Sequence, residues 1–431
     1  MKIKIKEKQY EEVAALPRPK QKKPMRQSFF FRLLLRIAST PDLLFTHFRV
    51  TKTDMERLGK REPCLYLMNH SSFIDLEIAS VILFPRRFHI VSTTDGFVGK
   101  NLLMRFLGCI PTKKFILDLG LIRHMSYALK DLKSSVLLFP EAGYSFDGTA
   151  TTLPDTLGSL TKMLGVPVVM IETKGAFARQ PLYNNLKKRK VRVSAEMRYL
   201  LSPDEIAEKS AEEISAIIAE SFSFDAFRQQ QESRMKIDSP DRAEGLERVL
   251  YKCPACGSEG RMKGLGAELV CHACSKHYVL DEYGSMAAVT GETEFSHIPD
   301  WYVWERDCVR EELKNGSYGL DADVDIYMLI DTKCLYRVGS GHLTHDCRGF
   351  HLTGCDGSLD YTQKPIASYT LNSDFYWYEI GDVIGIGNQN ALYYCFPKDS
   401  QISVAKARLA TEELYQIALR EKAEKRAKRV L

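Results

Sequence analysis

The chain has 431 residues, a length that favours two or three domains over a single one. A hydrophobic fraction of 45% and a charged fraction of 27% are typical of a soluble globular protein. No stretch offers the roughly 18 uninterrupted apolar residues of a membrane-spanning helix, and arginines that interrupt the first apolar segment argue against a secretory signal. Eleven cysteines, of which only four have metal-site spacing, favour a reducing cytosol over a disulfide framework.

Residues 1–48 are expected to form a basic tail and then an amphipathic helix that associates with a membrane. The net charge is only +5, yet residues 1–36 hold eleven Lys and Arg against three Glu. Within residues 26–38, Arg32 and Arg36 share one stripe of a helix, while phenylalanine, leucine and isoleucine cover most of the remainder. This pattern predicts a cytoplasmic protein, peripheral on the inner face of the cell membrane, with anionic lipid as partner. A solvated tail and a helix packed on the core are the alternatives.

Residues 49–235 alternate short apolar runs with amphipathic stretches, which predicts an α/β domain with a mostly parallel sheet. A further helix is expected over residues 202–222, with Ser202 as its N-cap and Glu205 as the second arm of a capping box. The predicted strands cover 64–68, 88–93, 135–140 and 166–172, and the other predicted helices cover 73–83, 97–107, 121–133 and 155–164.

Residues 236–295 contain two C-x2-C pairs separated by fourteen residues. Four thiolates at this spacing predict a closed structural zinc site in a short ribbon. A redox dithiol is the alternative, although a catalytic pair would not need a second pair. Few basic residues lie near the cysteines, so no nucleic-acid partner is expected. The predicted zinc ligands are Cys253, Cys256, Cys271 and Cys274.

Residues 296–431 are expected to form a β-rich domain. Tyr, Thr, Ile and Val are frequent over residues 320–400, in many short runs separated by glycine-containing turns, which predicts an antiparallel barrel or sandwich. A polar helix over about 403–425 closes the chain. Strands followed by one C-terminal helix resemble, in pattern only, a pleckstrin-homology or GRAM module.

His70 and Asp75 stand five positions apart at the junction between a predicted strand and a predicted helix. A histidine titrates near neutral pH, and a carboxylate on its far ring nitrogen fixes the tautomer and stabilises the imidazolium. If the helix starts after His70, the Asp75 side chain can fold back over the first turn. The pair would then act as a general base and its orienting partner on a substrate hydroxyl. A buried histidine with a purely structural role is the commoner explanation of such a spacing.

Four segments in order resemble the motifs of the glycerolipid acyltransferase family, which includes the lysophosphatidic acid acyltransferases. The third segment departs from the family form Phe-Pro-Glu-Gly-Thr-Arg-Ser, because Ala142, Gly143, Tyr144 and Ser145 follow Glu141 and the arginine is missing. The four segments are "NHSSFID" (69–75), "GCIPTKKF" (108–115), "LLFPEAGYSFDG" (137–148) and "GVPVVMI" (165–171).

The resemblance implies catalytic roles for His70 and Asp75 and a set of substrate-binding residues. Lys113 and Lys114 stand where the family has a basic residue, and either could hold an acceptor phosphate. A solvated turn is the alternative for the lysines, and a helix N-terminal carboxylate is the alternative for Glu141. The implied substrate-binding residues are Asn69, Lys113, Lys114, Glu141, Gly143 and Ser145.

The resemblance further implies the reaction. An acyl chain would move from acyl-CoA or acyl-carrier protein to the free hydroxyl of a lysophospholipid acceptor, lysophosphatidate, giving phosphatidate for phospholipid synthesis. Because the third-motif arginine is missing, phosphate binding could fall on the lysine pair, Arg123 or Arg179. The rivals are a glycerol-3-phosphate or other lysophospholipid acyltransferase, and a non-catalytic regulator that binds lipid or nucleic acid.

Overall fold

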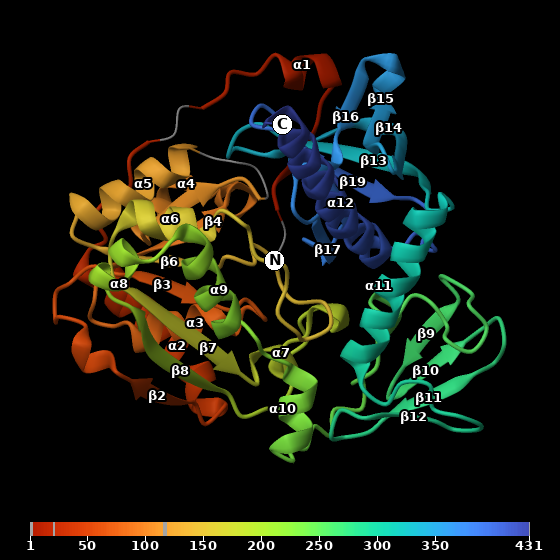
Figure 1. The fold of residues 1–431 in the computed structure, drawn as a ribbon, viewed down its shortest axis with the longest axis horizontal. Helices are drawn as coiled ribbons and strands as arrows, with labels where there is room; N and C mark the ends of the chain where they lie inside the picture. Colours follow the sequence, from red (N-terminus) through yellow and green to blue (C-terminus); the bar gives the residue numbers. More distant parts are fainter. Residues whose placement is uncertain (1–2, 20–21, 115–118, 431) are drawn as a thin grey trace.

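The structure, a computed structural model, describes residues 3–19, 22–114 and 119–430. Three parts are visible in Figure 1: an α/β part, a small sheet that carries the cysteine pairs, and a large antiparallel sheet with a long C-terminal helix. Phe115, the last residue of the second family-like segment, lies outside the described residues.

A seven-stranded mixed sheet forms the centre of the α/β part, in the order β2-β8-β7-β3-β6-β4-β5. Only β7 and β8 are antiparallel, and every other neighbouring pair in this order is parallel. The predicted strands are present as β3, β4, β6 and β7. The bounds are β2 (Arg49–Thr53), β3 (Leu65–Met68), β4 (Phe88–Thr93), β5 (Cys109–Thr112), β6 (Ser135–Leu138), β7 (Val168–Lys174) and β8 (Ser194–Leu201).

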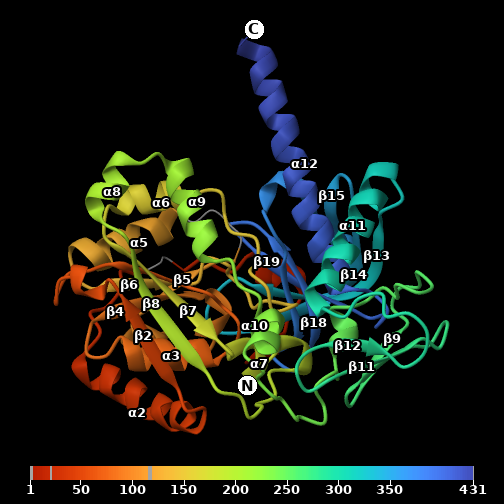
Figure 2. The ribbon, with the colours of Figure 1, turned by 60° about the horizontal axis from the view of Figure 1, so that its bottom comes forward.

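Helices cover both faces of this sheet, so its central strands are buried on both sides. In β3, Tyr66 and Met68 pack into one apolar cluster, with α2 and α3, whereas Leu65 and Leu67 pack into another, with α5, α6 and α9. Figure 2 shows the two helix layers on opposite sides of the sheet. The bounds are α2 (Phe29–Phe45), α3 (Ile74–Ile82), α4 (Asn101–Phe106), α5 (Leu119–Lys130), α6 (Leu157–Leu164), α7 (Ala176–Arg179), α8 (Pro203–Glu208), α9 (Ala211–Ser221) and α10 (Ala226–Glu232).

The single helix expected over residues 202–222 is divided into α8 and α9. The predicted capping box of Ser202 and Glu205 is present at the start of α8. A second capping box, made by Ser210 and Glu213, starts α9 and satisfies the backbone N–H groups that a break leaves without partners.

Helix α2 carries its apolar face outward. Phe30 and Ile37 are 66% and 60% exposed, whereas Arg32 is buried and donates a hydrogen bond to the Gln27 carbonyl. Of the two arginines in the predicted stripe, Arg36 is exposed, whereas Arg32 binds the carbonyl of a residue just before its own helix. Among the described residues, no helix has both the length and the apolar run needed to cross a bilayer.

The described N-terminal residues do not form a free tail. Strand β1 (Ile5–Glu7) pairs in parallel with β14 (Leu335–Asp346) of the large sheet, and the Glu7 carboxylate accepts a hydrogen bond from Arg337. Helix α1 (Tyr10–Ala14) follows and buries Val13 completely. The first strand of the basic segment is therefore attached to the C-terminal unit, which the opposite end of the sequence forms.

The cysteine pairs belong to a four-stranded antiparallel sheet in the order β12-β11-β10-β9. Helix α11 (Ile298–Asn315), which the sequence analysis did not predict, packs beside it through an edge-to-face contact between Trp301 and Tyr278. The strands are β9 (Met262–Leu265), β10 (Glu268–Cys271), β11 (His277–Leu280) and β12 (Met286–Ala288).

The large sheet and its final helix make up the C-terminal unit. Its strand order is β16-β15-β14-β13-β19-β18-β17, with antiparallel pairing along this path, as the β-rich prediction requires. Helix α12 (Val404–Val430) packs on the sheet and then projects beyond the body (Figure 2). The other strands are β13 (Leu320–Leu329), β15 (Gly349–Gly354), β16 (Leu359–Gln363), β17 (Asn372–Trp377), β18 (Gly381–Gly387) and β19 (Leu392–Pro397).

Candidate active site

His70, Glu141 and Thr173 meet because they follow or end three neighbouring strands. Strand β3 pairs in parallel with both β6 and β7, so the carboxyl ends of all three lie at one edge of the sheet. Ligand sites of α/β sheets gather at this edge. The strand order therefore brings together three residues that are far apart in the sequence.

The carboxylate of Asp75, in the first turn of α3, binds the loop that precedes this helix. Its Oδ2 atom accepts hydrogen bonds from the backbone N–H groups of Ser71 and Ser72, at 2.7 and 2.9 Å. Its Oδ1 atom accepts one from the Thr173 hydroxyl at 3.1 Å. Asp75 is completely buried, and these donors compensate for the loss of water around its charge.

The imidazole of His70 lies beside this carboxylate. Its Nδ1 atom is 3.4 Å from Asp75 Oδ2, and the ring lies against those of Phe139 and Tyr144, with centroids 4.1 and 4.4 Å away. The side chain is 23% exposed, and no hydrogen-bond partner for Nε2 is found in the described part of the chain. A proton on Nδ1 directed at Asp75 would leave Nε2 able to accept a proton from a bound hydroxyl.

Glu141 supports the backbone of His70. One carboxylate oxygen accepts a hydrogen bond from the His70 N–H at 2.7 Å, and the other accepts one from the Thr151 N–H at 2.8 Å. The side chain is fully enclosed, and burial raises the pKa of Glu141 to about 7. With both oxygens occupied by backbone groups, the geometry supports a positioning role. Acceptor binding by Glu141 stays a prediction.

Asn69 and Ser145 are buried within the same network. Asn69 accepts a hydrogen bond from the Thr173 N–H at 2.7 Å. The Ser145 N–H donates to the His70 carbonyl at 3.2 Å, and its hydroxyl donates to Thr149 at 2.6 Å. By contrast, Gly143 has open space where a side chain would begin. Substrate binding by these three residues also stays a prediction.

The lysine pair follows β5 and faces the C-terminal unit. Lys113 donates a hydrogen bond to the Gln389 carbonyl in the turn between β18 and β19. Burial raises the pKa of Asp374, on β17, to about 6. The positive charge of Lys114 acts in the opposite direction and limits this rise. No described contact joins either lysine to His70. No pattern in the sequence pointed to Asp374.

The other proposed phosphate-binding residues are not placed at His70 by any described contact. Arg179 is buried and binds Asp42 and the Arg189 carbonyl, so its guanidinium is already used within the fold. Arg123 is exposed and donates to the carbonyl of Leu119 on its own helix.

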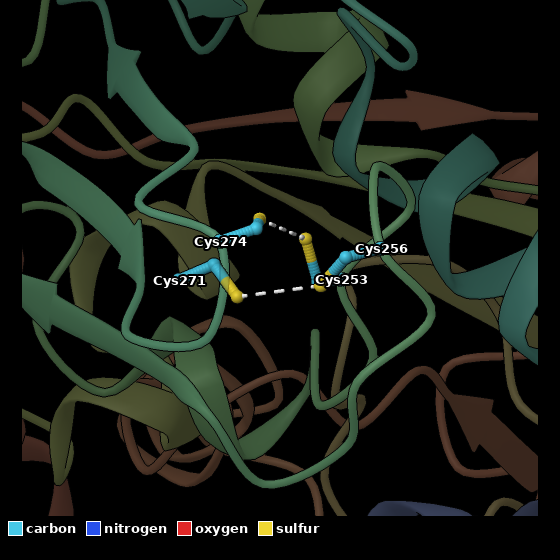
Figure 3. A group of neighbouring side chains, drawn as sticks. All are labelled: Cys253, Cys256, Cys271 and Cys274. Atoms are coloured by element: carbon cyan, nitrogen blue, oxygen red, sulfur yellow. Dashed lines mark hydrogen bonds between the residues drawn. The ribbon is translucent and has the colours of Figure 1, made fainter.

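The four cysteines meet between two loops, with their side chains directed toward one another (Figure 3). All four sulfur atoms lie within 4.8 Å of one another, and two pairs are 3.8 Å apart. Zinc–sulfur bonds of about 2.3 Å in a tetrahedron place the sulfur atoms about 3.8 Å apart, so this group fits a tetrahedral ion. The pairs are Cys253 with Cys274 and Cys256 with Cys271.

A family model described as Acyltransferase matches residues 49–173, which include His70, Asp75 and Glu141. The 1-acyl-sn-glycerophosphate (LPA) acyltransferase PlsC from Thermotoga maritima has a structure similar over 44% of this chain and 76% of that chain. The identity is 16% and the TM-score is 0.34, a value too low to support an argument about fold or function. No curated protein matches the chain.

Proposed function

We propose that the acyltransferase domain at residues 49–173 transfers an acyl chain from a thioester to the hydroxyl of a lysoglycerolipid, with His70 as general base. The observation that carries the proposal is the buried, fully hydrogen-bonded Asp75 beside Nδ1 of a partly exposed His70. A purely structural histidine would not need an accessible Nε2 atom at the carboxyl edge of the sheet.

In the proposed reaction, His70 Nε2 removes the proton of the acceptor hydroxyl as its oxygen attacks the thioester carbonyl carbon. A carbon–oxygen bond forms, the carbon–sulfur bond breaks, and the leaving thiolate takes the proton from the imidazolium. Asp75 stabilises that imidazolium while it exists. No covalent intermediate on the protein is needed.

The resemblance suggests lysophosphatidate as acceptor and phosphatidate as product, with acyl-CoA or acyl-carrier protein as donor. Glycerol 3-phosphate and other lysophospholipids are the competing acceptors. Lys113 and Lys114 are the cations that support a phosphate-bearing acceptor. Tyr144, in the place of the family's arginine, is the observation that favours a different acceptor or a non-catalytic regulator.

Two accessory features complete the proposal. The exposed apolar face of α2 would bind the cytoplasmic surface of the cell membrane, where anionic lipid attracts the basic segment. The four-cysteine group would hold a structural zinc ion, because thiolates are the ligands zinc prefers at such closed sites.

The test compares the full chain with a His70→Ala variant, on vesicles that contain lysophosphatidate, with long-chain acyl-CoA as donor. Thiol release and labelled product are followed together. We expect turnover by the wild type to fall by a factor of about 100 or more in the variant. His342→Ala, at an exposed histidine of the C-terminal unit, is the control and should keep wild-type turnover.

Acyl-carrier protein as donor, and glycerol 3-phosphate and other lysophospholipids as acceptors, are assayed in the same way. Equal turnover by wild type and His70→Ala would refute the general base. If no donor–acceptor pair reacts with either protein, the enzymatic proposal is wrong.

A further inference from the structure

A cavity of about 190 Å³ lies in the C-terminal unit, between its sheet and α12. His345 near the end of β14 and Gln363 at the end of β16 line one side, and Thr411 and Leu414 of α12 line the other. Lys364 also lines the cavity and is exposed, so the cavity reaches the surface there. The proposed acyl transfer uses none of these residues, and the cavity therefore needs an explanation of its own.

His345 is a buried polar side chain in the wall of this cavity, with only 1% of its surface exposed. Its ring is stacked on that of Phe350, with centroids 3.7 Å apart, and its Nδ1 atom is 2.9 Å from the Tyr318 hydroxyl. No described residue binds the other ring nitrogen. Because Nδ1 is occupied, Nε2 is the polar atom that His345 offers to the cavity.

The hydrogen of the Tyr318 hydroxyl decides whether Nε2 is a donor or an acceptor. Among the described residues this hydroxyl has only His345 as a hydrogen-bond partner, so it donates to Nδ1. Burial lowers the pKa of His345 to about 3, and the ring is therefore neutral at physiological pH. A neutral ring that accepts at Nδ1 carries its hydrogen on Nε2, and His345 thus presents an N–H donor to the cavity.

The other polar groups of the cavity are also donors. Gln363 accepts the Gly387 N–H with its Oε1 atom at 2.9 Å, which leaves its NH₂ group without a partner in the described structure. The ammonium group of Lys364 has neither an ion pair nor a hydrogen bond within the described ranges. The Thr411 hydroxyl is already used, because it donates to the Ala407 carbonyl at 2.8 Å. Three donors therefore remain available, and one of them carries a positive charge.

The carboxylates on the same elements do not cancel this charge. Asp346, next to His345 in the sequence, binds the guanidinium of Arg348 at 3.0 Å. Glu412 of α12 binds Arg408 at 3.2 Å. Each carboxylate thus has its own arginine, and the charge of Lys364 remains available to a ligand.

We infer that this cavity binds a phosphate monoester group or inorganic phosphate, with one phosphate oxygen at His345 Nε2 and the negative charge opposite Lys364. Three separate donors match three terminal oxygens better than the two oxygens of a carboxylate. A buried N–H that lacks a protein partner gains most from such a ligand, because the cost of its desolvation is then recovered. Inorganic phosphate and the headgroup of a phosphate-monoester lipid share this chemistry. The inference does not depend on the proposed acyl transfer.

The experiment titrates the full chain calorimetrically with three probes and without any acyl donor. The probes are inorganic phosphate, water-soluble short-chain phosphatidate and short-chain phosphatidylglycerol. Phosphatidate is a phosphate monoester with three terminal oxygens. Phosphatidylglycerol is a phosphodiester with only two, so it tests whether the third oxygen matters. The same titrations of His70→Ala separate this site from the candidate active site.

We expect phosphate or phosphatidate to bind, and Lys364→Gln and His345→Phe each to weaken that binding by a factor of about 10 or more. Phenylalanine keeps a ring to stack on Phe350 but has no N–H. Lys333→Gln, at an exposed lysine in the turn between β13 and β14, removes the same charge elsewhere and should keep the affinity. His70→Ala should keep it too, whether or not the protein transfers acyl chains.

Binding of both monoester probes would identify the phosphate group itself as the ligand. Binding of phosphatidate alone would identify a lipid headgroup, and binding of inorganic phosphate alone would identify the free ion; each of these results supports the inference if the two variants weaken it. Equal affinity for phosphatidylglycerol, no binding of any probe, or unchanged binding by Lys364→Gln would overturn it. Thermal unfolding checks each variant. If His345→Phe does not fold, Lys364→Gln decides, because its exposed side chain has no described partner to lose.

Discussion

Glu141 divides its carboxylate between two backbone N–H groups, those of His70 and Thr151. An amide at this position has only one oxygen, so Glu141→Gln leaves one of those buried donors unsatisfied. We expect the free energy of unfolding to fall by about 1–3 kcal/mol. Glu311→Gln, at an exposed residue of α11, should change it by much less.

The same substitution should also change the pH dependence of stability. In the folded protein burial raises the pKa of Glu141 to about 7, above its ordinary value of 4.5. The folded state therefore binds the proton of Glu141 more tightly than the unfolded state does. The stabilisation that comes from this proton is complete below pH 4.5 and is lost as the pH rises through 7. Urea unfolding of wild type and Glu141→Gln across this range should show that the variant lacks this contribution. If the free energy of unfolding had the same pH dependence in both proteins, this expectation would be wrong.

At the residue scale, the sequence was sufficient to predict that the side chains of His70 and Asp75 lie side by side. Both lie within seven consecutive residues, and a helix start after a strand brings them together. The contacts of Tyr369 with Pro140 and of Phe375 with Phe146 could not be predicted, because they depend on how two remote units pack.

Helix α2 shows which part of an amphipathic pattern the sequence can predict. The predicted helix over residues 26–38 is present, although it begins at Phe29 and continues through Pro41 to Phe45. The periodicity separates apolar from polar positions. It does not say which of them faces the body, and here the polar residue Arg32 is buried.

We expect the outward face of α2 to bind vesicles that contain anionic lipid. Replacing Phe30 and Ile37 with serine removes two exposed apolar side chains from the face and should reduce sedimentation with the vesicles by a factor of about 10. Val303→Ser, at an exposed apolar residue of α11, is the control and should sediment as the wild type does. Equal sedimentation of all three proteins would exclude this face as the membrane contact.

The ribbon should depend on metal for its stability. Cys274→Ser removes one of four ligands, so we expect the bound zinc to be lost or weakened and the thermal midpoint to fall by at least about 5 °C. Metal content and thermal unfolding are measured together. Cys347→Ser changes an exposed cysteine of the C-terminal unit and should alter neither quantity. Stoichiometric zinc in Cys274→Ser with an unchanged midpoint would contradict the assignment.

At the scale of the whole molecule, one apolar core joins all three parts. It extends from Phe146 and Phe177 of the α/β part, through Trp301 of α11, to the C-terminal sheet and Ala410 of α12. The sequence indicates each unit separately, from its own periodicity or cysteine spacing. It carries no local signal for contacts between units, and so the covering of the candidate active site could not be predicted.

Val13 tests the contribution of the N-terminal segment to this core. It is fully buried, so Val13→Ala should lower the free energy of unfolding by about 1–3 kcal/mol through lost burial and a cavity. Val50→Ala, on the exposed edge strand β2, should cost much less. Chemical unfolding compares the two variants, and equal stabilities would show that the segment is only loosely attached.

The pairing of β1 with β14 also has a consequence for synthesis on the ribosome. Glu7 and its partner Arg337 are 330 positions apart, which corresponds to roughly 15–65 s of translation at about 5–20 residues per second. During that interval the edge of β1 has no native partner, although residues 49–173 have already been made. A nascent chain therefore passes through a stage in which the residues of the candidate active site have been made, while Tyr369 and Phe375, which contact Pro140 and Phe146 beside it, have not.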